Sequence, residues 1–354
     1  MIVVGAPVGR FATLPRPSAI ALLALLVIAI AIGFLSPPAP THMKHVQGGD
    51  DLAFYQAVVA RVRAGQPYEA AAVAQLRAVH GPLRPFLAVR PPALAEMLAV
   101  LPNPRWGDVT LEALSLAFIG AWVVRLRSLG WGPANLGGAA IGLFAGVAAP
   151  LATKDMSLIH DAWAGLLIGL SLAARSDRRF WTAVALGLAA ALIRELALPY
   201  LAVMVAAALI ERRRAEAGAF AGALGLALIA VAWHAHAVDA LVSPTDLASP
   251  GWVKFGGWPF LMATAKWNLA VILGGAAAAA VIVPLSLTGA AGRGDGLGLR
   301  LATLLIGYTI GFMVIGRPEN AYWGLVTAPL IAVGLCLAPA ALRDLFRRAS
   351  GRAA

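Results

Sequence analysis

The stretch "RSDRRFWTAVALGLAAALIRELALPYLAVMVAAALIERRR", residues 175–214, decides the fold. Two arginine clusters enclose an apolar segment, residues 181–210, that is interrupted only by Arg194 and Glu195. Cytoplasmic connectors of membrane proteins are rich in Lys and Arg, so we place both clusters on the same side of a membrane. Because one full crossing takes about 20 residues, the segment predicts two short helices. They should meet near Arg194 and Glu195, short of the opposite surface.

The composition of the whole chain agrees with this interpretation. Of its 354 residues, 60% are hydrophobic and 13% charged, and the mean hydropathy of +0.80 is far above that of a water-soluble domain. We therefore predict an all-α integral membrane protein, a polytopic bundle of about ten spans in one transmembrane domain, residues 1–354. The predicted spans are 18–35, 109–124, 134–150, 161–174, 181–193, 196–210, 219–238, 267–287, 301–315 and 321–337.

The net charge of +11 is distributed by side of the membrane. The predicted cytoplasmic connectors and the C-terminal tail are all rich in Arg, which places both termini in the cytoplasm and suits a multi-pass protein of a bacterial inner membrane. Topology therefore explains the positive charge, and no nucleic-acid partner is predicted. The single cysteine, Cys336, excludes an intrachain disulfide and a cysteine metal site.

The first extracytoplasmic loop, residues 36–108, alternates amphipathic and Pro-rich pieces. Residues 51–63 predict a helix whose apolar face, which includes Leu52 and Val59, should lie along the membrane surface. Asp50 or Asp51 suits its N-terminus, where a carboxylate meets free N–H groups and the positive end of the helix dipole. Two further short helices are expected, in "YEAAAVAQLRAVHG" and in "VRPPALAEMLAVLPNP".

The segment "GGDDLAFYQAVVARVRAGQPY", residues 48–68, resembles the first extracytoplasmic loop of GT-C-fold glycosyltransferases of the mannosyltransferase and arabinosyltransferase type. Asp51 and Tyr55 have the family's acid-to-tyrosine spacing, and Gly65, Pro67 and Tyr68 match its Gly-x-x-Pro-Tyr ending. The resemblance continues in style through "RPPALAEMLAVL", "HDAWAGLLIGLSLAA" and "LAAALIRELALPYLAV". It departs at Arg90, where family members often have Tyr.

This resemblance implies a GT-C-like fold and transfer of a sugar from a polyprenyl-phosphate carrier to a lipid or glycan acceptor at the extracytoplasmic face. The loop 36–108 is then the candidate catalytic loop. Asp51 is the candidate general base and Asp50 the second catalytic candidate; the alternative is that both only cap a helix. The sequence requires no cofactor and assigns no metal ligand, although two adjacent carboxylates could bind a divalent cation.

Cations on the outer side are the candidates for binding the donor phosphate, namely Arg194, Lys154 and Arg317. For Arg194 the alternative is an internal salt bridge with Glu195 or another acid, and for the other two a snorkelling interfacial cation. The candidates for binding donor or acceptor are Tyr55, Tyr68, His160, Asp161 and Glu195. Asp161 could instead cap a helix.

Other function classes fit the sequence less well. A transporter or lipid flippase should have polar residues near the midplane and an inverted repeat, and neither pattern is evident. A non-catalytic subunit of an envelope polysaccharide assembly system would use the loop only as a binding platform. Nucleotide-binding signatures are absent from the sequence, so the expected partners are a polyprenyl-phosphate sugar, a lipid or glycan acceptor and the membrane.

Overall fold

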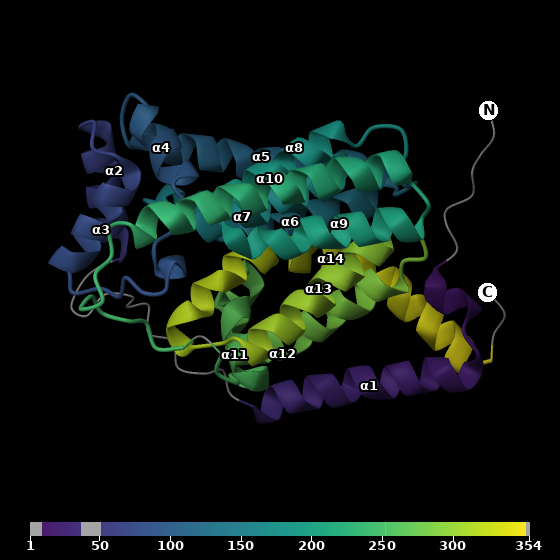
Figure 1. Ribbon diagram of the computed structural model, residues 1–354. Helices are drawn as coiled ribbons and strands as arrows, with labels where there is room; N and C mark the ends of the chain where they lie inside the picture. Colours follow the sequence, from purple (N-terminus) through teal and green to yellow (C-terminus); the bar gives the residue numbers. More distant parts are fainter. Residues whose placement is uncertain (1–8, 37–50, 252, 352–354) are drawn as a thin grey trace.

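The computed structural model describes residues 9–36, 51–251 and 253–351. Within these ranges the chain forms α-helices and short 3₁₀ helices, with two isolated bridges and no strand. Long helices run side by side, and the three short helices α2–α4 cover one end (Figure 1). The prediction of an all-α membrane protein is confirmed at this level. The helices are α1 Arg16–Leu35, α2 Asp51–Arg63, α3 Tyr68–Ala78, α4 Ala93–Val100, α5 Arg105–Ser128, α6 Pro133–Ala152, α7 His160–Ala174, α8 Trp181–Ile193, α9 Leu198–Ile210, α10 Arg214–Asp239, α11 Gly257–Thr264, α12 Leu269–Gly292, α13 Gly296–Val314 and α14 Gly324–Ala349.

Each of the ten predicted spans falls on one of these helices. Among the described residues, seven helices are long and apolar enough to cross a membrane: α1, α5, α6, α10, α12, α13 and the segment 318–349 that contains α14. The other three, α7 to α9, have only 15, 13 and 13 residues. The total of ten spans therefore stays a prediction. The short helix α11 was not expected from the sequence.

The helix break at Arg194 lies where the sequence predicts it. α8 ends at Ile193, Arg194 has extended backbone angles (φ −148°, ψ 116°), and a 3₁₀ turn over Glu195–Ala197 leads into α9. Pro199 lies in the first turn of α9, where its missing N–H group costs nothing. The break places two charged side chains between helix ends rather than on a lipid-facing surface.

The helix α7 lies in the middle of the bundle and is buried along almost its whole length. Two of its glycines allow close approach of neighbouring helices. A Cβ atom on Gly165 would lie 2.3 Å from the carbonyl oxygen of Leu325 in α14, and one on Gly169 would lie 2.5 Å from the ring of Phe118 in α5. Inside a membrane the hydrophobic effect does not drive helices together, because the lipid tails are also apolar. Small residues of this kind favour helix association by letting the backbones pack closely.

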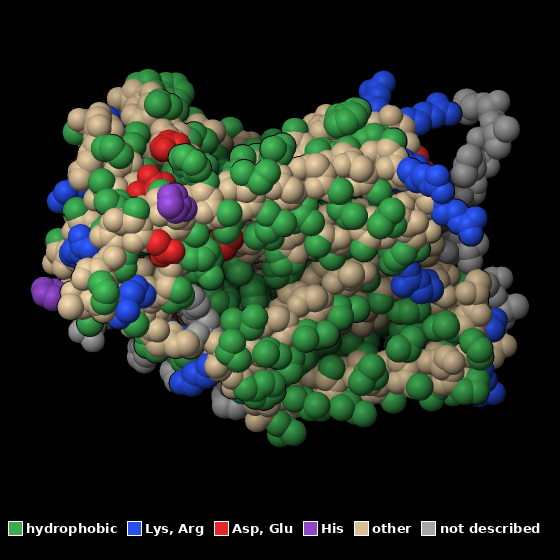
Figure 2. Space-filling view, in the orientation of Figure 1, with side chains coloured by type: hydrophobic (Ala, Val, Ile, Leu, Met, Phe, Trp, Pro, Cys, Tyr) green, Lys and Arg blue, Asp and Glu red, His purple; other side chains and the backbone are tan. Residues whose placement is uncertain are grey.

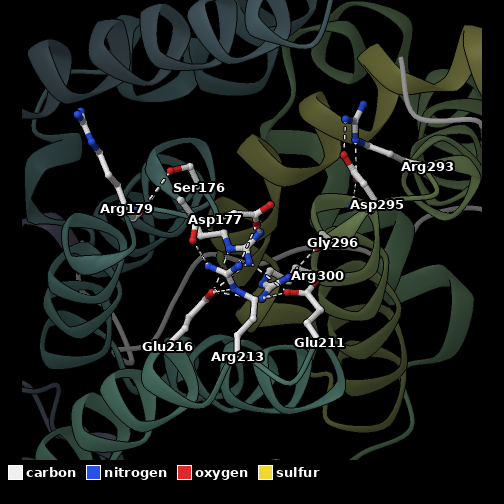
Figure 3. A network of polar contacts seen from close by, with 12 residues as sticks. Ser176, Asp177, Arg179, Glu211, Arg213, Glu216, Arg293, Asp295, Gly296 and Arg300 are labelled. Atoms are coloured by element: carbon white, nitrogen blue, oxygen red, sulfur yellow. Dashed lines mark hydrogen bonds and ion pairs between the residues drawn. The ribbon is translucent and has the colours of Figure 1, made fainter. Parts of the chain in front are cut away.

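The connectors predicted to be cytoplasmic gather at the end of the bundle away from α2–α4, which we call the Arg-rich end (Figures 1 and 2). A buried network of ion pairs links three of these connectors, the ones after α7, α9 and α12 (Figure 3). Arg175 binds Glu216 at 2.9 Å and Glu211 at 3.1 Å, and Arg300 binds Glu211 at 2.6 Å. Arg213 also binds Glu216. The network thus links the ends of α7, α9, α10 and α13.

The amphipathic helix α2 has the predicted bounds, but its apolar face packs against the protein core, where a membrane surface was expected. Val58 and Val59 are buried in the main hydrophobic core, and the ring of Tyr55 lies 5.3 Å from that of His160 at the start of α7. The expectation was wrong because α3, α4 and the turn before α7 supply apolar partners from the protein itself. As a result, α2 is held against the bundle with Asp51 at its first residue.

Candidate functional site

A cavity of about 490 Å³ opens at the end of the molecule opposite the Arg-rich end, and we call it the large pocket. Its walls come from α2, the connection between α3 and α4, the loop after α10, and the 3₁₀ segment Pro318–Trp323. Acidic, basic and histidine side chains gather on the surface around α2 and α3 (Figure 2). The residues that line the large pocket are Asp51, Phe54, Tyr55, Leu76, His80, Pro82, Leu87, Ala88, Arg90, Leu247, Ala248, Ser249, Pro250, Arg317, Glu319 and Asn320.

Three residues predicted from the sequence meet in this pocket: Asp51, Tyr55 and Arg317. Burial raises the pKa of the Tyr55 hydroxyl, although the nearby Arg90 opposes the shift, so this phenol is neutral at physiological pH. Arg317 donates to the carbonyl of Pro250 at 2.9 Å and also pairs with Glu319. Its guanidinium is thereby held at the pocket wall rather than extended as a free interfacial cation.

Arg90 is the central cation of the site and was not among the residues predicted from the sequence to bind phosphate. It donates a hydrogen bond to the hydroxyl of Tyr322 and lies 3.7 Å from Glu195. Its own carbonyl accepts a hydrogen bond from the Tyr68 hydroxyl at 2.8 Å. Tyr68 therefore positions the backbone of Arg90. The one sequence signal that could have found Arg90 is its place in the "RPP" segment, at the position where the GT-C motif often has Tyr.

Arg194 is buried beneath the residues that line the large pocket. It forms the internal salt bridge that was predicted as the alternative to phosphate binding. It is 1% exposed, donates from Nε to Asp161 at 3.0 Å, and also pairs with Glu195. Asp161 is also buried and is the second residue of α7, whose N-cap is Ile159, so the capping interpretation of Asp161 is wrong. The helix begins one residue earlier than predicted, at His160, and the Asp161 carboxylate accepts the Arg194 hydrogen bond instead. Asp161, Arg194, Glu195 and Arg90 thus form a row of alternating charges that ends at the large pocket.

A second, small cavity of about 20 Å³ lies on the inner side of Tyr55 and Arg90, which line both cavities. Tyr68 and His160 also line it. His160 is 3% exposed, and neither ring nitrogen forms a hydrogen bond of normal geometry with any described residue, although the carbonyls of Pro91 and Leu158 lie nearby. The space is enough for about one water molecule.

Two predicted residues are not placed in the site. Lys154 is exposed in the connection after α6 and lines neither cavity. Asp50 lies outside the described residues. In the part of the chain that the structure describes, no three His, Cys, Asp or Glu side chains converge.

The segment Pro318–Trp323 supplies site residues that were not predicted from the sequence. Asn320 lines the large pocket and Tyr322 binds Arg90, yet the sequence singled out only Arg317 from this region. The connector "GRPEN", residues 316–320, mixes charged and polar residues, but nothing in its sequence shows that this segment lies against Arg90.

Comparison with known proteins adds no relative from which a role could be transferred. No protein-family model matches the chain, and neither the curated proteins nor the solved structures contain a match. The likeness to GT-C-fold enzymes therefore rests on the sequence motifs of residues 46–210.

Proposed function

We propose that this chain is a membrane glycosyltransferase that moves a sugar from a polyprenyl-phosphate carrier to a lipid or glycan acceptor at the extracytoplasmic face. One observation carries the proposal. The large pocket combines the carboxylate of Asp51 with the guanidinium groups of Arg90 and Arg317 in one cavity at the end opposite the Arg-rich connectors. Its volume of about 490 Å³ is that of an ordinary small-molecule site.

The pocket has the groups that this reaction needs. An acceptor hydroxyl oxygen forms a bond to the anomeric carbon of the sugar, and the bond from that carbon to the phosphate oxygen breaks. Asp51 takes the proton of the hydroxyl, while the phosphate leaves with the electron pair. Arg90 and Arg317 suit the phosphate, because a guanidinium binds phosphate oxygens through charge-assisted, often bidentate hydrogen bonds.

Asp51 can act as base while it begins a helix. It is the first residue of α2, where the helix dipole favours the ionised carboxylate. It also lines the large pocket, so its place at the start of α2 is compatible with proton transfer.

The test is transfer of radiolabelled sugar in vesicles supplied with a panel of polyprenyl-phosphate sugars. Asp51→Asn should lower transfer about 10²- to 10⁴-fold, the usual contribution of a positioned base, with unchanged amounts of folded protein. Asp239→Asn is the matched control, because Asp239 is exposed at the end of α10 and lines neither cavity.

Full activity of Asp51→Asn would contradict the assignment of the base and direct attention to Asp50. Wild-type protein that transfers no sugar from any donor in the panel would contradict the proposed function itself.

A further inference from the structure

Three buried side chains next to Arg90 carry polar atoms that have no hydrogen-bond partner among the described residues. They are His160, Glu195 through Oε2, and Asn320 through Oδ1. His160 lines the small cavity, and Glu195 lies behind the pocket wall within 3.7 Å of Arg90. Only Asn320 lines the large pocket. Of the three unpartnered groups, it is the one that belongs to a residue lining the large pocket.

Hydrogen bonds hold the backbone on both sides of Asn320. Its N–H donates to the carbonyl of Arg317 at 2.8 Å, which closes the first turn of the 3₁₀ segment. The next turn places the Tyr322 hydroxyl against Arg90, and the indole of Trp267 donates to the carbonyl of Ala321 at 2.9 Å. Asn320 is 3% exposed, so the side-chain amide cannot turn into bulk water to find a partner.

A buried acceptor without a donor costs about 1–3 kcal/mol, so such an atom is expected where a ligand supplies the donor. Neither Arg90, which binds Tyr322 and Glu195, nor Arg317, which binds Pro250 and Glu319, donates a hydrogen bond to Asn320 Oδ1. A ligand that supplies this donor beside two arginines should carry no positive charge at the donating group. A hydroxyl group next to a phosphate has these properties.

We infer that Asn320 is a specificity-determining residue of the large pocket, and that its Oδ1 accepts a hydrogen bond from a hydroxyl of the sugar whose phosphate lies at Arg90 and Arg317. This inference rests on the proposed function and deepens it, because it names the protein group that recognises a hydroxyl of the sugar. A site built to bind a hydroxyl rejects the analogue that lacks it, since the protein acceptor is then left buried and unpaired.

The test combines variants of Asn320 with monodeoxy analogues of the active donor, measured as kcat/KM and as equilibrium binding of radiolabelled donor. In wild type, one analogue should lose about 10- to 100-fold relative to the full sugar. Asn320→Leu should lower kcat/KM for the full sugar by a similar factor and should show no further loss with that analogue. Asn103→Leu is the control, since Asn103 is exposed and lines neither cavity.

A second variant separates recognition from misfolding. Asn320→Asp keeps the acceptor oxygen and the shape, so its preference for the full sugar over the deoxy analogue should persist even if the added charge weakens phosphate binding.

The inference is overturned if every deoxy analogue loses the same factor in wild type and in Asn320→Leu. If the wild type binds the sugars selectively but transfers none, the proposed function is contradicted. The role of Asn320 then follows from the ratio of affinities for the full sugar and the deoxy analogue, compared between wild type and Asn320→Leu. Wild type that neither binds nor transfers any polyprenyl-phosphate sugar overturns both.

Discussion

At the scale of single residues, the site depends on what one guanidinium can do. Arg90 binds the Tyr322 hydroxyl, lies 3.7 Å from Glu195, and still borders the large pocket. A planar fork of five N–H donors can serve several partners at once, whereas an ammonium group is a compact point charge. The charge and the geometry of this position can therefore be tested separately.

We expect Arg90→Lys to lower sugar transfer about 10- to 100-fold, which corresponds to the loss of one hydrogen bond to a charged group. The charge is kept, so the fold should persist. Vesicle transfer assays and thermal unfolding in detergent check the two parts. Arg105→Lys serves as the control, because Arg105 is exposed at the start of α5. Unchanged transfer by Arg90→Lys would contradict a role for the guanidinium fork.

Asp246 provides a pH-dependent contact in the loop that borders the large pocket. Arg77 of α3 binds both its oxygens, at 2.9 and 2.6 Å, and these hydrogen bonds, together with one from the backbone N–H of Ser243, lower its pKa from 3.8 to about 2. A carboxylate with a depressed pKa stabilises the fold above its unfolded pKa and loses that contribution as the pH falls through its folded pKa.

The contact should therefore be intact from pH 7 down to about 4 and lost as the pH falls further toward 2. The amides of Leu83 and Arg84, which donate to the carbonyl of Leu247 in the same loop, report it through their hydrogen-exchange protection factors. Asp246→Asn should show the weakened protection already at pH 7. Equal protection in both proteins at pH 7 would contradict this account.

At the scale of helices, close packing of α7 depends on glycines that face backbone atoms. Gly165 faces the carbonyl of Leu325 and the Cα of Val326, and neither atom can move without displacing α14. Gly120, at an exposed position of α5, has open space where a Cβ would be. The two positions differ in packing, not in residue type or helical conformation.

Gly165→Ala should destabilise the protein by about 1–3 kcal/mol through overpacking. Gly120→Ala should be neutral or slightly stabilising, since Ala favours helix more than Gly does. Thermal unfolding of the two purified variants in the same detergent measures the difference. A melting temperature for Gly165→Ala equal to that of Gly120→Ala would argue against the close α7–α14 contact.

At the scale of the whole molecule, the ion network at the Arg-rich end joins helices that are far apart in sequence. Glu216 is 1% exposed and binds Arg175, Arg213 and Arg300, whereas Asp177 in the same network is 77% exposed. Removing one partner from a buried pair leaves an uncompensated charge, while exposed pairs contribute little.

Glu216→Gln should therefore cost about 3–5 kcal/mol, and Asp177→Asn about 0–1 kcal/mol. Unfolding temperatures of the two variants compare them directly. Similar losses in both would mean that the network is more hydrated than its burial indicates.

The orientation of the molecule can be tested through its single cysteine. In a Cys336→Ala background, Arg105→Cys should react with a membrane-impermeant maleimide in right-side-out vesicles, and Arg178→Cys should react only after permeabilisation. Both positions are exposed, and they lie at opposite ends of the bundle, near the start of α5 and after α7. The reverse labelling pattern would place the large pocket on the cytoplasmic side and contradict the proposed function.

The sequence by itself determined the local features of this protein. The positions of the long helices follow from apolar runs, the break at Arg194 follows from a segment too short for two full crossings, and α2 begins and ends at the predicted residues. These features depend on hydropathy, helix length and charge within a few tens of residues. The motif of residues 48–68 likewise pointed to Asp51 and Tyr55, which both line the large pocket.

Only the tertiary structure decided which charged and polar side chains meet. Arg194 pairs with Asp161, 33 residues away, and Arg90 binds Tyr322, which is 232 residues away. In a membrane bundle both lipid and neighbouring helices accept apolar side chains, so hydropathy identifies a helix but not its partners. The partners are chosen by close packing at small residues such as Gly165, and this packing brings Pro318–Trp323 against Arg90 to form the site.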